Sequence, residues 1–291
     1  MKNKIESMDR KVVLITGCSS GFGYLTAIFL ASKGFKVFAG VRNEKKAARL
    51  IEDERYLKNN LRIVYFDVSN ENSIAKALQE IAKETERIDI LINNAGYGVG
   101  GTFEDLSSEE IFAQFQTNFF GVQSVTRAFL PLIKKSSDPR IINISSIAAY
   151  CGVPFLGAYL SSKWALEGFS ESLRHELAYF GIKVLLLQPG IFPTAIFYEN
   201  AKYADKFGTD ESKYKGVSES VRDKFLNVIP LINNDSRKVP RIIHKLIIRK
   251  NPSFRTIIGL DAKIVSVMRR FLPYSLFEFF ERKFFYSSFA R

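Results

Sequence analysis

The sequence lacks the cysteines of a disulfide-linked scaffold and the long apolar runs of a membrane-spanning protein. Cys18 and Cys151 are its only two cysteines, too few for a disulfide framework. There is no run of about eighteen apolar residues, so no transmembrane helix is predicted. No metal site is predicted. The opening residues, MKNKIESMDR, have no apolar stretch typical of a signal peptide. A reducing, cytoplasmic location is therefore expected.

The chain has the composition of one large globular α/β domain. It is 46% hydrophobic and 25% charged over 291 residues, and single α/β domains often exceed 200 residues. Its net charge of +12 is uneven: residues 237–291 hold 13 Lys+Arg against 3 Asp+Glu, whereas residues 1–236 hold 29 against 27. Such a basic segment suits an anionic substrate, an anionic membrane or nucleic acid. No recognised nucleic-acid motif accompanies the charge, so we expect no nucleic-acid partner.

A strand, a glycine turn and a helix open the chain. Residues 11–16, KVVLIT, are apolar and β-branched and predict a buried parallel strand, and a helical apolar pattern follows the glycines at 17, 21 and 23. Glycines let the backbone approach a pyrophosphate, and the helix N-terminus offers it free N–H groups. The turn therefore predicts a nucleotide site. The residues expected to contact the nucleotide here are Gly17, Ser19, Ser20, Gly21, Phe22 and Gly23.

The end of the second predicted strand, 36–41, indicates which nucleotide binds. An acidic residue at this position binds the ribose 2′-hydroxyl of NAD, whereas an arginine accommodates the 2′-phosphate of NADP. Arg42 stands here, which predicts NADP(H), with NAD(H) as the alternative. A third strand, 61–68, ends in Asp67 and Val68, where Asp67 is placed to receive the adenine amino group.

Two further segments are expected beside the nucleotide. A fourth strand, 89–93, leads into Asn94, Ala95 and Gly96, whose small size permits close packing against it. Ser107 and Glu110 then form a capping box for a helix that runs past Asn118 toward Pro131. An asparagine inside such a helix, next to Phe119, Phe120 and Gly121, predicts a distortion that frees a backbone carbonyl for water.

Ser146, Tyr159 and Lys163 form the candidate catalytic centre. A fifth strand, 140–145, delivers Ser146 at its carboxyl end, where open α/β sheets bind ligands. Tyr159 and Lys163 are four residues apart on a predicted helix, 158–180, so the ammonium is expected to lower the tyrosine pKa. This makes the phenol usable as an acid or base near neutral pH, while Ser146 holds the oxygen that receives its proton. A Tyr-x-x-x-Lys pair is also common on helix surfaces, so the surrounding motifs must decide whether this pair is catalytic.

Six motifs together resemble the short-chain dehydrogenase/reductase family: TGCSSGFG at 16–23, NNAG at 93–96, Asn118, Ser146, YxxxK at 159–163 and PGIFPT at 189–194. VFAGVRN at 37–43 and FRTIIGLDA at 254–262 are similar to its 17β-hydroxysteroid dehydrogenase-like branch. The resemblance covers roughly residues 10–195. It implies a Rossmann-type, doubly wound parallel sheet of about seven strands and hydride exchange between a nicotinamide and a carbonyl or secondary alcohol.

The resemblance also implies residue roles. Tyr159 would be the general acid/base, Ser146 would orient the carbonyl oxygen, and Lys163 would bind the nicotinamide ribose. Asn118 would hold a water that links Lys163 to solvent. The resemblance also implies a homodimer or homotetramer, the usual assembly of the family. Many NADP-preferring members add a basic residue inside the glycine motif, where Ser19 and Ser20 stand here. The nicotinamide amide would be bordered by Pro189, Gly190 and Thr194, with the backbone of Ile191 exposed to it.

The remainder of the chain is expected to serve the substrate. Residues of about 196–235 predict either a mobile lid or an ordered surface insertion, and about 236–291 form a basic, aromatic extension with a helix at 237–250 and a strand at 256–259. From 271 to 289, 9 of 19 residues are aromatic, with Phe277, Phe280 and Phe284 near one helix face. The alternatives for this segment are core or oligomer interface, and peripheral contact with an anionic membrane.

The sequence therefore predicts an NADP(H)-dependent oxidoreductase that acts on a carbonyl or secondary alcohol. Its 26 phenylalanines favour a lipophilic substrate, such as a steroid-, retinoid- or lipid-like ketone. The alternative is an NADP(H)-binding regulatory or scaffold protein without turnover.

Overall fold

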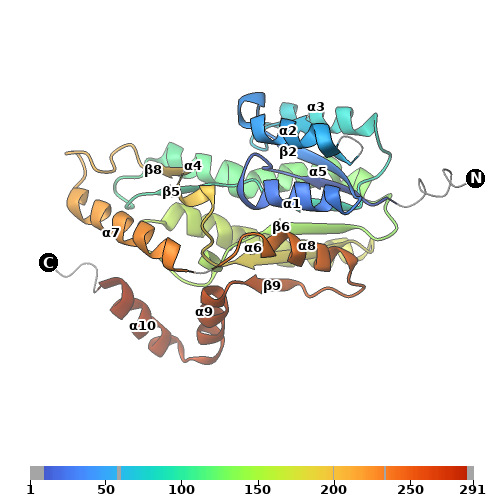
Figure 1. Ribbon diagram of the computed structural model, residues 1–291. Helices are drawn as coiled ribbons and strands as arrows, with labels where there is room; N and C mark the ends of the chain where they lie inside the picture. The colour runs from blue at the N-terminus through green and yellow to red at the C-terminus, as the bar shows by residue number, and fades with distance from the viewer. Residues whose placement is uncertain (1–9, 58–59, 199, 233, 287–291) are drawn as a thin grey trace, which may run out of the picture.

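A seven-stranded parallel sheet with helices on both faces forms the body of the protein (Figure 1). The computed structural model describes residues 10–57, 60–198, 200–232 and 234–286. The strand order is β3-β2-β1-β4-β6-β7-β9, and all neighbouring strands are parallel. The order reverses between β1 and β4, which opens a crevice at the carboxyl ends of these strands. The predicted fold class is confirmed.

The strands follow the apolar runs of the sequence. Because helices cover both faces of the sheet, both sets of alternating side chains are buried, and a strand reads as a continuous apolar run. In β1, Val13 and Ile15 join the core on one face, and Val12 and Leu14 join the core on the other. The strands are β1 (Val12–Ile15), β2 (Lys36–Val41), β3 (Leu61–Tyr65), β4 (Ile90–Asn93), β6 (Arg140–Ile144), β7 (Lys183–Pro189) and β9 (Arg255–Ile258).

Each face of the sheet has its own helical layer. One core cluster includes buried side chains of α1 (Gly21–Ser32), α2 (Ala48–Leu57) and α8 (Lys238–Ile248). The other includes those of α3 (Glu71–Ala82), α5 (Gly121–Ile133) and α6 (Gly157–Ala178). Gly34 and Gly181, just after α1 and α6, both have positive φ angles, as expected for glycines that end helices.

A π-helical turn interrupts the helix that precedes β6. Ser107 and Glu110 cap α4 (Ser108–Phe115) reciprocally, so the predicted capping box is confirmed. The turn then spans Gln116–Phe120 before α5 begins, and Asn118 lies in its middle. The predicted distortion at Asn118 is confirmed, and such π-bulges frequently occur at functional sites.

The sequence did not predict several elements around the crevice. A short strand, β5 (Gly98–Gly100), pairs in parallel with β8 (Ala201–Tyr203) to form a second sheet. The helix α7 (Lys215–Val228) follows β8. Residues 196–235 thus carry regular elements, in keeping with an ordered insertion, and their motion as a lid stays a prediction.

The C-terminal extension leaves the layered body. In Figure 1 the helices α9 (Leu260–Phe271) and α10 (Tyr274–Tyr286) lie beyond the sheet edge formed by β9. Phe277 is buried whereas Phe280 is 43% exposed, so these two residues do not share one buried face. The side chain of Phe284, the residues after 286 and the opening residues 1–9 lie outside what the structure describes. Within the described residues, no helix combines the length and the apolarity needed to cross a bilayer.

Candidate active site

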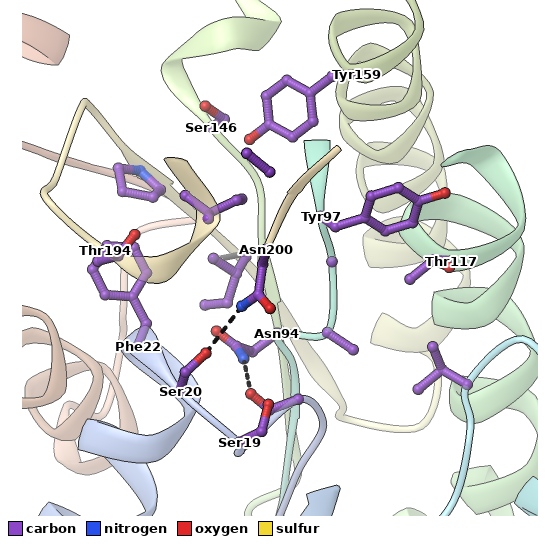
Figure 2. Close-up of a pocket in the computed structure, with 18 of the residues that line it drawn as sticks. Ser19, Ser20, Phe22, Asn94, Tyr97, Thr117, Ser146, Tyr159, Thr194 and Asn200 are labelled. Atoms are coloured by element: carbon purple, nitrogen blue, oxygen red, sulfur yellow. Dashed lines mark hydrogen bonds between the residues drawn. The ribbon is translucent and has the colours of Figure 1, made fainter. Parts of the chain in front are cut away.

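A cleft of about 300 Å³ lies at the carboxyl ends of β1, β2, β4, β6 and β7, and it collects most of the predicted site residues (Figure 2). Four of the predicted residues do not line it: Gly21, Gly23, Asn118 and Ile191. The predicted residues that line the cleft are Gly17, Ser19, Ser20, Phe22, Arg42, Asp67, Val68, Asn94, Ala95, Gly96, Ser146, Tyr159, Lys163, Pro189, Gly190 and Thr194.

The glycine turn is shaped by close contacts with the segment after β4. Gly17 has φ +72°, and a Cβ there would lie 2.7 Å from Cα of Ala95. A Cβ at Gly23 would collide with the carbonyl oxygen of Gly17 and the amide of Asn94. Gly21 also has a positive φ, of +56°. Gly21 and Gly23 therefore set the shape of the turn and do not themselves line the cleft.

Thr16 and Asn94 hold the two loops together. The hydroxyl of Thr16 accepts the backbone N–H groups of Asn94 and Ala95 at 3.0 and 2.9 Å. In return, the side-chain amide of Asn94 donates to the carbonyl oxygens of Thr16 and Gly17 at 2.9 and 3.0 Å. These bonds fix the glycine turn against the loop that leads to the catalytic residues.

The start of α1 fits a pyrophosphate. Its N-cap residue, Ser20, makes no side-chain capping bond, and its first turn contains no acidic residue. The N–H groups and the positive dipole end of this helix are therefore available to an anion in the cleft. With the glycine turn beside it, the start of α1 offers backbone donors that suit a phosphate group.

Cationic side chains line the cleft at the end of β2. Arg42 is one, as predicted, and Lys46 is a second that the sequence analysis missed. Asn43, between them, accepts the backbone N–H of Lys46 at 3.2 Å and caps the 3₁₀ turn Glu44–Lys46 that carries Lys46. The spacing of four residues between the two cations was the available signal. Farther along, Ser69 holds Oδ1 of Asp67 with its N–H and its hydroxyl, at 2.9 and 2.6 Å.

Ser146 and Tyr159 meet at the inner end of the cleft. Figure 2 shows the phenol of Tyr159, from the first turn of α6, directed toward Ser146 at the end of β6. Oγ of Ser146 accepts the backbone N–H of Ala148 at 3.1 Å. Burial raises the pKa of Tyr159, and the neighbouring hydroxyl of Ser146 opposes this rise. The predicted lowering of the Tyr159 pKa is therefore wrong for this arrangement, because burial outweighs the lowering contribution of the Ser146 hydroxyl.

Lys163 is buried beneath Tyr159. Its Nζ donates to the carbonyl oxygen of Ile144 at 2.9 Å and lies 5.9 Å from the centroid of the Tyr159 ring. Burial lowers the pKa of Lys163 to about 8, against the opposing charge of Glu167. The ammonium form thus prevails at neutral pH and gives way to the amine in mildly alkaline solution.

Asn118 is buried behind the cleft and holds the backbone of Tyr97. Its Oδ1 accepts the Tyr97 N–H at 3.1 Å, and its Nδ2 donates to the Tyr97 carbonyl at 3.0 Å and to Oγ of Ser162 at 3.2 Å. A Cβ at Gly96 would lie 3.2 Å from Oδ1 of Asn118 and 3.8 Å from Nζ of Lys163. Both side chains therefore lie close to Gly96. Asn118 therefore positions the loop beside Lys163, and its predicted water stays a prediction.

Ile191 does not have the exposed backbone that was predicted. Its N–H donates to Oδ2 of Asp261 at 2.6 Å, and its carbonyl accepts from Nδ2 of Asn234 at 2.7 Å. The same amide of Asn234 donates to Oδ1 of Asp261 at 2.8 Å. Both backbone groups of Ile191 are thus engaged inside the protein. The prediction was wrong because these two partners are remote in sequence.

The segment after β7 closes one side of the cleft with residues that the sequence did not single out. Asn200 donates to Oγ of Ser20 at 3.2 Å (Figure 2), which ties this segment to the start of α1. Lys202 lies 4.8 Å above the ring of Tyr97. Tyr97 follows the NNAG motif directly, which was a usable signal, whereas the polar lid sequence offered none. The missed lining residues also include Thr117, Ile196, Phe197 and Ala201.

Comparison with known proteins agrees with this site. The family model described as short chain dehydrogenase matches residues 11–205. A 3-ketodihydrosphingosine reductase of Bacteroides thetaiotaomicron is 37% identical over 285 residues, which cover 96% of this chain and 99% of the relative. A short-chain dehydrogenase structure from Streptomyces avermitilis has a TM-score of 0.79 at 27% identity and covers 94% and 98% of the two chains. A short chain dehydrogenase/reductase from Burkholderia phymatum, in complex with NAD, has a TM-score of 0.77 at 25% identity and covers 90% and 92%.

Proposed function

This chain belongs to the short chain dehydrogenase family of oxidoreductases, and we propose that it uses NADPH to reduce a keto group on a long-chain lipid. The observation that carries the proposal is the meeting of Ser146, Tyr159 and the buried Lys163 at the inner end of the cleft (Figure 2). The similarity to a reductase of a long-chain keto base, over almost the whole length of both chains, supports the substrate class.

Tyr159 and Ser146 act on the carbonyl oxygen. When bound, the nicotinamide supplies the hydride that reduces the carbonyl carbon. Ser146 donates a hydrogen bond to the substrate oxygen and holds it beside the phenol. Tyr159 gives its proton to this oxygen as the carbon is reduced, so little negative charge develops there. The raised pKa of Tyr159 keeps the phenol protonated at neutral pH, which suits the reductive direction.

Lys163 stabilises the phenolate that Tyr159 becomes. Its ammonium lies under the ring and is oriented by the carbonyl of Ile144. Coulomb attraction in a buried site is stronger than in water, so this charge favours proton transfer away from the phenol. Asn118, through the backbone of Tyr97, keeps the loop next to Lys163 in place.

Arg42 and Lys46 support NADPH over NADH. Both side chains line the cleft at the end of β2, where this family of folds places the adenosine ribose. Two cations there match the charge of a 2′-phosphate, whereas the family's usual NAD-binding carboxylate is replaced by Arg42. Ser19, which also lines the cleft, can donate a further hydrogen bond to the phosphate.

An apolar wall supports a lipophilic substrate. Ile196 and Phe197 line the cleft from the segment after β7, and Phe197 is backed by Phe225 of α7, with ring centroids 5.6 Å apart. Hydrocarbon transferred from water onto such side chains is stabilised by the hydrophobic effect. This wall suits an alkyl chain attached to the reacting ketone.

The test is turnover by the purified full chain with a panel of ketones. NADPH or NADH is mixed with 3-ketodihydrosphingosine, retinal, a ketosteroid or a medium-chain ketone, and nicotinamide absorbance is followed. We expect NADPH consumption that is fastest with the long-chain keto base. Exclusive use of the ketosteroid or retinal would overturn the substrate class, and exclusive use of NADH would overturn the cofactor assignment. Light scattering on the same sample tests the proposed homodimer or homotetramer.

A further inference from the structure

The C-terminal arm, defined as α9 and α10 (residues 260–286), carries an exposed apolar face. On α9, Leu260, Ile264, Val267 and Phe271 are each at least 51% exposed. Their spacings of four, three and four residues place them on one side of the helix. On α10, Leu276, Phe279 and Phe280 are exposed as well. Both helices of the arm therefore present large apolar side chains to their surroundings.

The inner side of the arm is separately packed. Ala262 and Phe277 are buried, and the guanidinium of Arg269 lies over the rings of Tyr274 and Phe277, at 4.7 and 5.2 Å from their centroids. Asp261, in the first turn of α9, is bonded to Ile191 of the body. The arm is thus anchored on one side, and its outer apolar face is not needed for that anchoring.

Basic side chains accompany the outer face. Lys263 and Arg270, seven residues apart on α9, flank the apolar stripe and are exposed. Lys283 is exposed beside Phe279 and Phe280 on α10. The segment 237–291 also carries most of the net charge of the chain. Aromatic and aliphatic residues on one face with Lys and Arg at its margin are typical of helices that lie in the surface of an anionic membrane.

We propose that the outer face of the C-terminal arm docks into the interface of an anionic lipid bilayer. Aromatic and aliphatic side chains enter the boundary between headgroups and acyl chains, while Lys263 and Arg270 meet lipid phosphates. A second copy of this chain suits the face less well. In a two-fold contact the same patch meets itself, which would bring the basic margins of both copies together.

Docking would place the active site next to the membrane. α9 packs on the 3₁₀ turn Ile147–Ala149, which directly follows Ser146. Farther along, Cys151 and Gly152 lie near the carboxylate of Glu281 on α10. A long-chain ketone held in the bilayer would thus meet the segment that carries Ser146. This consequence rests on the proposed function, whereas docking itself does not.

Co-sedimentation with vesicles tests the docking. The full chain is mixed, at low salt, with vesicles of phosphatidylcholine alone or with a third of phosphatidylglycerol, and the bound fraction is measured. We expect binding to the anionic vesicles that weakens as salt is raised. Phe271→Glu should lower the partition coefficient by about tenfold, the effect of removing one large apolar side chain and adding a repelled charge. Phe112→Glu on α4 is the matched control, since Phe112 and Phe271 are 70% and 72% exposed, and it should bind as the wild type does.

Three outcomes would overturn the docking. The first is no binding of the wild type to anionic vesicles at low salt. The second is equal binding of Phe271→Glu and the wild type. The third is a wild type that stays off vesicles but forms a dimer that Phe271→Glu dissociates, which would make a second copy the occupant. Vesicle binding is measured without turnover, so Tyr159→Phe should bind anionic vesicles as the wild type does. Docking can therefore fail or succeed independently of the proposed function, which the turnover assay tests.

Discussion

The carboxylate of Asp261 accepts the backbone N–H of Ile191 at 2.6 Å, across 70 residues of chain. The same carboxylate fills the space that a Cβ at Gly190 would need. Asn234 completes the arrangement by donating to both Asp261 and Ile191. The loop after β7, which borders the cleft through Pro189 and Gly190, is therefore held in place by the first turn of the C-terminal arm.

Asp261→Ala should loosen this loop. The substitution leaves the N–H of Ile191 without its acceptor, at a cost of about 1–3 kcal/mol in the free energy of unfolding. The KM for NADPH should rise more than the KM for the ketone, since the loop borders the cofactor cleft. Denaturant unfolding and steady-state kinetics measure the two effects. Asp261→Asn keeps one acceptor oxygen and should show a smaller loss; equal effects of both variants would contradict the role of the Ile191 contact.

Gly23→Ala should impair nucleotide binding. A Cβ at Gly23 collides with the carbonyl of Gly17 and the amide of Asn94, which must shift the glycine turn. The Kd for NADPH, measured by fluorescence titration, should rise by at least about tenfold. Gly168→Ala on α6 is the matched control because nothing lies within 4 Å of its Cβ position. It should leave NADPH binding unchanged and stabilise the fold by about 0.5–1 kcal/mol, and a similar loss of binding in both variants would refute the account of the turn.

The rate of reduction should fall as pH rises through about 8, the pKa of Lys163. Below this pH the ammonium is present and stabilises the Tyr159 phenolate, and above it the charge is lost. Tyr159 itself keeps its proton to higher pH, because burial raises its pKa. A profile of kcat/KM for reduction from pH 6 to 10 tests this. A flat profile to pH 9 or beyond would contradict the role given to Lys163.

The lowered pKa of Lys163 makes the free energy of unfolding depend on pH. Lys163 binds its proton less tightly in the fold than in the unfolded chain, so burial of its charge opposes folding at low pH. This opposition is relieved between about pH 8 and the ordinary lysine value of 10.5. Lys163→Met should remove this pH-dependent part of the free energy of unfolding, which denaturant titrations at several pH values can measure.

Arg42→Ala and Lys46→Ala should each weaken NADPH selectively. Each loses a charge-assisted contact with the 2′-phosphate, which corresponds to a rise of about tenfold in the NADPH KM with little change for NADH. Lys45→Ala is the control, because Lys45 neighbours Lys46 but does not line the cleft. An equal rise of the KM for NADH and the KM for NADPH would show that Arg42 and Lys46 do not bind the 2′-phosphate.

The sequence predicted the features that depend on local pattern. Continuous apolar runs identify the strands because both faces of a parallel sheet are covered. The asparagine beside Phe119, Phe120 and Gly121 predicted a distortion of the helix, which the structure shows as a π-helical turn. Most of the residues predicted to bind the cofactor line the cleft, since they follow directly on strand ends.

The failures concern features that depend on contacts between distant residues. The pairing of β5 with β8 joins residues about a hundred positions apart in a polar segment without periodicity. The engagement of Ile191 by Asp261 and Asn234 could not be read from the PGIFPT motif. Spacing in sequence placed Lys163 near Tyr159, but the direction of the Tyr159 pKa is set by burial, which only the folded chain defines.

The most direct test of the catalytic account is the Tyr159→Phe variant, compared with the wild type for NADPH-dependent reduction of 3-ketodihydrosphingosine and for NADPH affinity. Removal of a general acid should lower kcat by about 10²–10⁴-fold, while the Kd for NADPH should stay within about twofold, because the phenolic oxygen gives the proton to the substrate. Turnover by Tyr159→Phe near the wild-type rate would contradict this role. A wild type that binds NADPH but turns over no ketone in the panel would instead favour the regulatory or scaffold alternative.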